Sequence, residues 1–233
     1  MAARRATGCH PPPSSGRVRD GLPHAPQMAD FMQLRSSPAS PFGRKVKIGA
    51  ALCGVALDIV WADTSDPGDS LRSQNPLGKI PALLREGKAP VFDSPVILEF
   101  LDIEAGGGCI IPAAGEARIA ALTQQALADG IMDAALLQVY EVRHRAENER
   151  SPKWVENQAG KVTRGLDAFA AALPARGGVS APAHVGEIGL ACALGYLDLR
   201  FAGAWRAGYP VLVDWLADFA ARVPAFEATR PPA

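Results

Sequence analysis

Two short motifs in the chain have residue types that could hold a small peptide by its backbone and its carboxylate. The first is the segment 75–81, which reads Asn-Pro-Leu-Gly-Lys-Ile-Pro. We expect the Ile80–Pro81 bond to be cis, because the Ile80 N–H and C=O would then face an open edge where a bound peptide could pair with them. The alternative is a trans proline that only starts an edge strand. Lys79 would supply positive charge to acidic groups of the ligand, or it is an ordinary solvated lysine.

The second motif is Asp93-Ser94-Pro95, at the expected start of a helix. The free N–H groups and positive potential of a helix amino terminus can hold a carboxylate, and Asp93 can accept from a ligand's ammonium group. Ser94 is also a natural N-cap, with Pro95 at the first helical position. The two roles are compatible, so the same residues predict a binding site and a capped helix.

Both motifs lie in a short α/β unit that begins near Met32. Its strands are expected at 32–35, 57–61, 82–84 and 90–92, the last two as a hairpin. A helix that Pro41 opens and Gly54 closes follows the first strand, and a second helix runs from Ser94 through Ile103. The polar segment 64–75 is expected to be a loop or a short irregular helix.

The glycine-rich segment 105–115 breaks both periodicities and marks an interdomain linker. Beyond it the apolar spacing is helical throughout, with helices expected at 116–145, 152–173, 185–199 and 211–223. The helix 185–199 carries apolar or small residues on several sides, which predicts that it is buried. The sequence therefore predicts an α/β domain over 30–104 and an all-helical domain over 116–233.

With these elements in place, the span from about Met32 to Pro231 resembles the cytosolic glutathione transferases, which have a thioredoxin-like amino-terminal domain followed by an all-helical one. The matching residues are Ser40-Pro41-Phe42-Gly43-Arg44-Lys45-Val46, the segment 75–81, Asp93-Ser94, and the segments 186–188 and 195–198. The chain is most similar to bacterial serine-type members, which have Ser-Pro-Phe at the first helix. His184 departs from the family pattern, which has a serine or threonine cap at that place.

The resemblance implies that the bound peptide is glutathione, acting as co-substrate. Lys79, Ile80, Pro81, Asp93 and Ser94 would then form its binding site. It also implies a homodimer and a small electrophile as second substrate, whose identity the sequence does not specify.

Ser40 is the residue expected to act on the glutathione sulfur. A free thiol has a pKa of about 8.5, and lowering it by two units corresponds to about 2.7 kcal/mol of differential stabilisation. The Ser40 hydroxyl and the dipole of the following helix could supply this, although Ser40 could be only a helix cap, and Ser37 is the second candidate. A serine cannot form the mixed disulfides of relatives with Cys-Pro here, so conjugation is expected and not thiol exchange.

The electrophile is expected in the cleft between the domains, against Met132, Leu136 and Tyr140. These residues recur at helical spacing and could equally be plain core. Asp129 and Asp133 lie four residues apart on the same helix, where like charges disfavour the helix by about 0.2–0.5 kcal/mol. They indicate a partner or a functional site, with a solvated helix face as the simpler account.

The composition excludes several other classes of function. Among 233 residues, 24 Lys and Arg balance 24 Asp and Glu, so there is no electrostatic footprint for nucleic acid or an anionic membrane. No apolar run reaches the roughly 18–20 residues of a membrane span. The four cysteines and four histidines show no zinc-ligand spacing. We therefore expect a cytoplasmic protein with no metal and no nucleic-acid or membrane partner.

Residues 1–29 are rich in proline and arginine and have no hydrophobic period, which predicts a disordered tail. A transit peptide is one alternative, and an over-extended translation start is favoured over it because Met28 and Met32 precede the first strand. Two other functions also remain open. A non-catalytic glutathione- or ligand-binding module would share the fold. A glutathione-dependent isomerase would need Ser-Ser-Cys in the first loop, where residues 36–40 read Ser-Ser-Pro-Ala-Ser.

Overall fold

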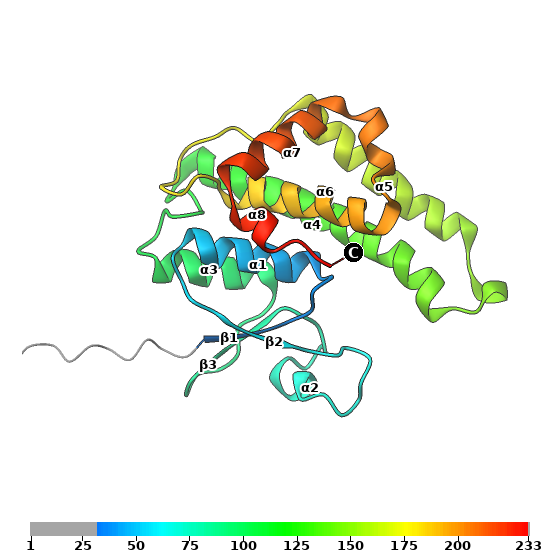
Figure 1. The fold of residues 1–233 in the computed structure, drawn as a ribbon, viewed down its shortest axis with the longest axis horizontal. Helices are drawn as coiled ribbons and strands as arrows, with labels where there is room; N and C mark the ends of the chain where they lie inside the picture. The colour runs from blue at the N-terminus through cyan, green and yellow to red at the C-terminus, as the bar shows by residue number, and fades with distance from the viewer. Residues whose placement is uncertain (1–31, 233) are drawn as a thin grey trace, which may run out of the picture. The chain divides into compact units, whose positions relative to one another are not determined.

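The computed structural model describes residues 32–232, and the predicted fold class is confirmed in them (Figure 1). A three-stranded sheet with three helices is followed by five further helices and no strand within the described range. The predicted tail, residues 1–29, lies outside the described residues.

The sheet has the order β2-β1-β3. The central strand β1 (Met32–Ser36) runs parallel to β2 (Asp58–Trp61) and antiparallel to β3 (Ala82–Arg85). The predicted strand at 90–92 is wrong, because only Val91 pairs, in an isolated bridge with Leu83. Pro90 has no N–H to extend the ladder, and α3 begins at Ser94.

Two helices join the sheet to the rest of the molecule. Figure 1 shows α1 (Pro41–Leu52) and α3 (Ser94–Glu104) between the sheet and the later helices, with the short α2 (Leu71–Gln74) beyond the sheet. Helix α1 ends as predicted, since Gly54 has a φ of +68°, a conformation that glycine adopts without a Cβ penalty.

The helical part comprises α4 (Gly115–His144), α5 (Pro152–Ala171), α6 (Val185–Phe201), α7 (Pro210–Arg222) and the short α8 (Ala225–Ala228). Two 3-10 turns, Glu147–Glu149 and Ala204–Gly208, lie between them. The prediction that the helix from Val185 is buried on several sides is confirmed, because every residue from 183 to 194 is buried. Helix α6 is therefore the centre around which the other helices pack (Figure 1).

His184 caps α6 in place of the usual hydroxyl residue. Its Nδ1 accepts a hydrogen bond from the Gly186 N–H at 3.1 Å, and the Glu187 carboxylate accepts from the His184 N–H at 3.1 Å. Two otherwise unsatisfied groups at the helix start are thereby paired. The departure from the family pattern has thus kept the capping function.

The segment expected to be a linker is held against α3 by one carboxylate. Asp102 accepts hydrogen bonds from the N–H groups of Gly108, Ile110 and Ile111 at 2.7–3.0 Å. Ile110 and Ile111 are buried in a core that continues from the sheet and α3 into the helical part.

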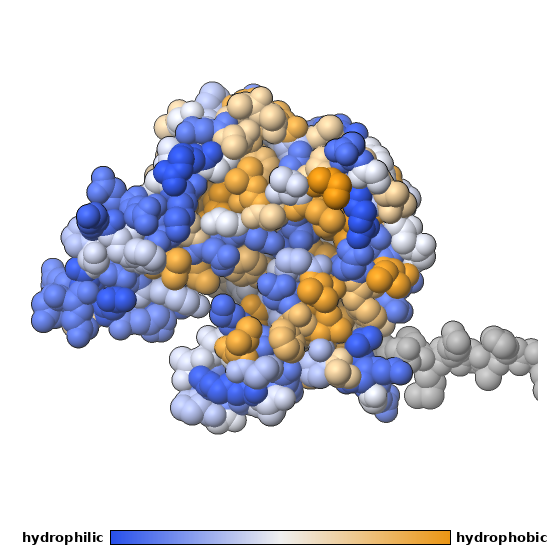
Figure 2. Space-filling model, turned by 180° about the vertical axis from the view of Figure 1, so that it is seen from behind, coloured by the Kyte–Doolittle hydropathy of each residue, from blue (hydrophilic) through white to orange (hydrophobic). Residues whose placement is uncertain are grey.

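The described surface carries both hydrophobic and hydrophilic residues (Figure 2). Figure 2 shows hydrophobic residues gathered in the middle of one face, with hydrophilic residues covering the projection at its left. None of the helices between residues 32 and 232 combines the length and the apolar character that crossing a membrane would need.

Candidate functional site

Ser40 stands at the amino terminus of α1. Its Oγ accepts a hydrogen bond from the Gly43 N–H at 3.0 Å, so it is the helix cap. A hydroxyl can also donate one hydrogen, and no described residue accepts one from Ser40. The residue is 9% exposed and lines a cavity of about 520 Å³. The geometry thus allows Ser40 to cap the helix and donate into the cavity at the same time.

The first turn of α1 lies so close to the end of β1 that it requires a glycine. A Cβ at position 43 would collide with Ser36 Oγ, so Gly43 lets the first turn of α1 approach the end of β1. Ser37, the second candidate donor, lines the same cavity as Ser40. Both candidate donors, Ser37 and Ser40, therefore line one cavity.

The turn before Ile80 is fixed by a side chain that the sequence analysis did not single out. Buried Asn75 accepts from the Leu77 N–H at 3.1 Å, and its amide donates to the Lys79 carbonyl at 2.8 Å. Gly78 completes the turn with a φ of +60°. An Asn-Pro pair is a turn signal, and it could have pointed to this role.

The Ile80–Pro81 peptide bond is cis, which confirms that prediction. The Ile80 N–H and C=O make no hydrogen bond to any described residue. A donor and an acceptor of the backbone are thus available together, as pairing with an extended peptide requires.

In the second motif, the N-cap of α3 lies one residue earlier than predicted. The Asp93 carbonyl accepts the first helical hydrogen bond, from the Ile97 N–H at 3.0 Å, so Asp93 is the N-cap and Ser94 the first residue of α3. The assignment of Ser94 as the cap is therefore wrong. The exposed Asp93 carboxylate makes no hydrogen bond or ion pair with the described residues, which leaves it free to accept from a ligand.

Two adjoining cavities contain these residues. The smaller, of about 190 Å³, is lined by all five predicted glutathione-binding residues, Lys79, Ile80, Pro81, Asp93 and Ser94. The larger contains Ser40. Both are lined by Lys79 and Ile80 and also by Phe42 and Asp133. The structure therefore brings the two motifs and Ser40 to two cavities that share four lining residues.

The three residues predicted to contact the electrophile do not all line the same cavity. Leu136 and Tyr140 of α4 line the 520 Å³ cavity, whereas Met132 has no exposed surface and packs in the core. The spacing that placed Met132 with the other two could not distinguish the cavity side of α4 from its core side.

Asp129 and Asp133 have different surroundings. Asp129 forms an ion pair with Lys45 of α1, so a solvated helix face is the wrong account of it. Asp133 is exposed to both cavities. Burial raises the pKa of the Asp133 carboxyl, the positive charges of Lys79 and Lys45 oppose this rise, and the charge of Asp93 adds to it.

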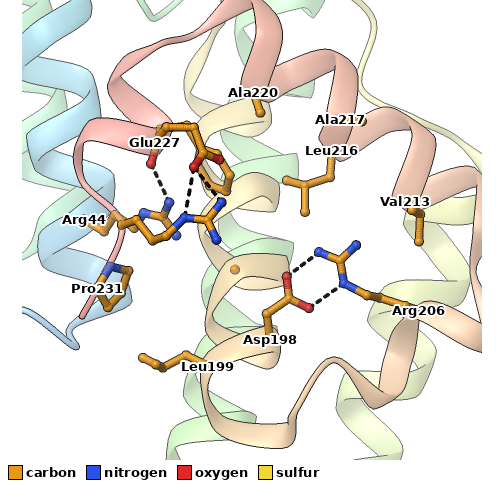
Figure 3. Close-up of a pocket in the computed structure, with 13 residues that line it drawn as sticks. Arg44, Asp198, Leu199, Arg206, Val213, Leu216, Ala217, Ala220, Glu227 and Pro231 are labelled. Carbon is orange, nitrogen blue, oxygen red and sulfur yellow. Dashed lines mark hydrogen bonds and ion pairs between the residues drawn. The ribbon is translucent and has the colours of Figure 1, made fainter. Parts of the chain in front are cut away.

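A further cavity, of about 700 Å³, lies where α1 meets α6, α7 and α8 (Figure 3). Its arginines already have partners within the protein. Arg206 pairs with Asp198 and Arg230 with Glu227, and Arg44 donates a hydrogen bond to the Phe226 carbonyl at 2.6 Å. Ser40 and the two binding motifs do not line it. The reactive residue types thus gather in the 190 and 520 Å³ cavities.

The described part of the chain has no group of three or more His, Cys, Asp or Glu side chains placed to hold a metal ion. Among its thiols, burial raises the pKa of Cys192 to about 11, and burial raises that of Cys53 as well. These two cysteines are therefore protonated at neutral pH.

Comparison with known proteins identifies the relatives of the chain. Residues 39–103 match the family model "Glutathione S-transferase, N-terminal domain", and residues 152–218 match "Glutathione S-transferase, C-terminal domain". YibF of Escherichia coli K12, described as an uncharacterized GST-like protein, is 31% identical over 86% of this chain and 99% of its own length.

Solved structures give the same result. A glutathione S-transferase from Methylobacillus flagellatus with bound glutathione has a TM-score of 0.79 and 36% identity, over 86% of this chain and 100% of its own. A glutathione transferase family member from Pseudomonas fluorescens Pf-5, bound to S-(propanoic acid)-glutathione, has a TM-score of 0.75 and 36% identity, over 87% and 100%.

Proposed function

This chain belongs to the glutathione S-transferase family, and from that premise we propose that it conjugates the thiolate of glutathione to a small electrophile. The observation that carries the proposal is the shared wall of the two cavities. A glutathione molecule held in the smaller one would present its sulfur at Ser40, where the space opens into the larger one.

Each end of the tripeptide has a partner in this arrangement. The γ-glutamyl carboxylate would take the free N–H groups at the start of α3, with the Ser94 hydroxyl beside them. The Asp93 carboxylate would accept from the γ-glutamyl ammonium group. The unpaired Ile80 N–H and C=O would pair with the cysteinyl backbone, and Lys79 would balance the negative charge of the ligand.

Ser40 would act on the sulfur. Its hydroxyl hydrogen would stabilise the thiolate, because hydrogen bonding to the charged form of a group lowers its pKa. The positive potential at the start of α1 acts in the same direction. The thiol proton passes to solvent, and the sulfur forms a C–S bond as the leaving group departs with its electron pair. The relative solved with S-(propanoic acid)-glutathione, a glutathione substituted at sulfur, supports this reading.

Retention on immobilised glutathione, followed by turnover of a panel of electrophiles, tests the proposal. Retention with turnover supports a transferase. Retention without turnover on any member of the panel would assign the alternative role, a non-catalytic glutathione- or ligand-binding module. Failure to bind glutathione would contradict both.

The remaining proposals concern organisation and location. We propose a serine-type transferase with a glutathione-binding domain over 30–104, a linker over 105–115 and a helical domain over 116–233. A homodimer is proposed from the family, and exposed apolar side chains support it: Val96 and Ile103 of α3 and Ile119 of α4 are 51–62% exposed. Cytoplasmic location and a role in detoxification are proposed from the family alone.

A further inference from the structure

Two arginines face the 520 Å³ cavity without an anionic partner. Arg143 comes from α4 and is exposed, and Arg200 comes from α6, is half-buried and lies beside the Tyr196 hydroxyl; neither forms an ion pair with a described carboxylate. The Nε of Arg200 is buried and unsatisfied. By contrast, Arg35 and Arg118 each pair with a carboxylate at 2.6 Å. For Arg200, whose guanidinium is partly withdrawn from water, the lack of a partner for Nε is costly.

Groups already in the cavity do not supply the missing anion. Burial raises the pKa of the Tyr196 phenol, with Arg200 opposing the rise, so Tyr196 is neutral at pH 7. Asp133 is the one carboxylate among the described lining residues, and Lys79 is the cation that most opposes the rise of its pKa. Two guanidinium groups on the wall formed by α4 and α6 thus have no carboxylate partner among the described residues.

The rest of that wall is apolar and aromatic. The guanidinium carbon of Arg143 lies 5.9 Å from the centre of the Tyr140 ring, and that of Arg200 lies 5.7 Å from the Tyr196 ring. Leu136 and Leu137 line the same cavity. Two guanidinium groups above an apolar floor match a molecule with a hydrophobic body and a planar carboxylate, which arginine binds through two parallel hydrogen bonds.

We propose that the electrophile carries a carboxylate, which Arg143 and Arg200 bind while its apolar body lies against Leu136, Tyr140 and Tyr196. The inference rests on the proposed function, because it takes glutathione as the occupant of the adjoining cavity. For an aryl chloride with a carboxylate, the glutathione sulfur forms a C–S bond at the chlorine-bearing carbon. Chloride leaves with the C–Cl electron pair, and the thiol proton has already passed to solvent.

A binding experiment tests the proposal independently of turnover. Calorimetry compares S-carboxyethyl-glutathione with S-propyl-glutathione, which has a substituent of nearly the same size without the charge. We expect the parent protein to bind the carboxylate form roughly tenfold more tightly. Arg143→Gln and Arg200→Gln should each reduce this preference at least threefold while changing the affinity for the S-propyl form by less than twofold.

The matched control is Arg164→Gln, which removes a positive charge from an exposed position of α5 away from the cavity. It should keep the full preference. Equal affinity of the parent for the two compounds, or a preference that survives both cavity variants, would overturn the inference. Turnover of chlorodinitrobenzoate against its methyl ester is measured separately, so that a protein that discriminates in binding but does not turn over either substrate contradicts only the proposed transferase activity.

Discussion

Lys45 Nζ donates hydrogen bonds to both carboxylate oxygens of Asp129, at 2.6 and 2.7 Å, and the lysine side chain has no exposed surface. Lys45 lies on α1, little more than one turn beyond Ser40, and Asp129 lies on α4, one turn before Asp133. The pair therefore fixes α1, which Ser40 caps, against α4, which lines the 520 Å³ cavity.

Removing the carboxylate of this pair should strongly destabilise the fold. In Asp129→Ala the fully buried Lys45 ammonium loses its partner, and breaking a buried pair in this way costs about 3–5 kcal/mol of the free energy of unfolding. Urea denaturation followed by circular dichroism measures the loss. The double variant Lys45→Met with Asp129→Leu should recover most of it, because an apolar pair leaves no buried charge. A single variant as stable as the parent would contradict the prediction.

The raised pKa of Asp133 predicts a pH-dependent difference in stability between the parent and Asp133→Asn. An acid whose pKa is higher in the folded than in the unfolded chain binds more protons when folded. Its contribution to the free energy of unfolding therefore falls as pH rises from about 4, the ordinary aspartate value, through the raised pKa. The free energy of unfolding of the asparagine variant, relative to that of the parent, should therefore increase over that pH interval.

Urea titrations of the two proteins at successive pH values give this difference curve. Asp214→Asn, at an exposed aspartate of α7 with no partner among the described residues, serves as the control for the loss of one carboxylate. A flat curve for Asp133→Asn would count against partial desolvation of its carboxyl at the cavities.

The cap formed by His184 can be tested by substitution. Its Nε2 lies 2.9 Å from the Ala175 carbonyl, which can only accept, so Nε2 carries the hydrogen and Nδ1 is free to accept from Gly186. His184→Ala should lower the free energy of unfolding by about 0.5–2 kcal/mol through loss of the cap. His184→Ser supplies a new acceptor but no link to Ala175, so its stability should fall between the other two. Indistinguishable denaturation of parent and alanine variant would show that the ring does not cap.

Local signals explain which parts of the site could be predicted from the sequence. The cis bond at Ile80–Pro81 and the cap at Ser40 depend on neighbouring residues, so a short sequence motif is enough to predict each of them. The shift of the cap from Ser94 to Asp93 is within the single residue by which such patterns are uncertain.

Long-range pairings explain what the sequence could not show. Lys45 and Asp129 are 84 positions apart, and nothing near either residue indicates the other. Arg143 and Arg200 line one cavity because α4 and α6 pack together. That packing is a feature of the tertiary structure and is not visible in either sequence segment. Met132 was misplaced for the same reason, since helical spacing defines a stripe of residues but not its neighbour.

Asp93 should contribute to glutathione affinity and not to the fold. Its carboxylate contacts no described polar group, so Asp93→Ala should leave the melting temperature near that of the parent. Loss of a charge-assisted contact with the γ-glutamyl ammonium should weaken glutathione binding by about 1.5–3 kcal/mol, measured by calorimetry. Asp214→Ala should bind as the parent does. Unchanged affinity in Asp93→Ala would remove this residue from the site.

Ser40 should act on the sulfur and not on affinity. Ser40→Ala should leave the dissociation constant of glutathione within a few-fold, while the pKa of the bound thiol rises by roughly one to two units through loss of a hydrogen bond to the thiolate. Turnover at neutral pH should fall and partly recover at higher pH. Thiolate absorbance of bound glutathione against pH is the direct measurement.

Because Ser40 also caps α1, a second variant must separate the cap from the donor. Alanine at an N-cap costs about 0.5–2 kcal/mol of stability, whereas glycine costs only a few tenths. If the hydroxyl stabilises the thiolate, Ser40→Gly and Ser40→Ala should titrate alike, both above the parent, although their stabilities differ. If Ser40→Gly instead titrates like the parent, the start of α1 stabilises the thiolate through its N–H groups and dipole. A Ser37→Ala variant that raised the thiol pKa while both Ser40 variants did not would transfer the donor role to Ser37.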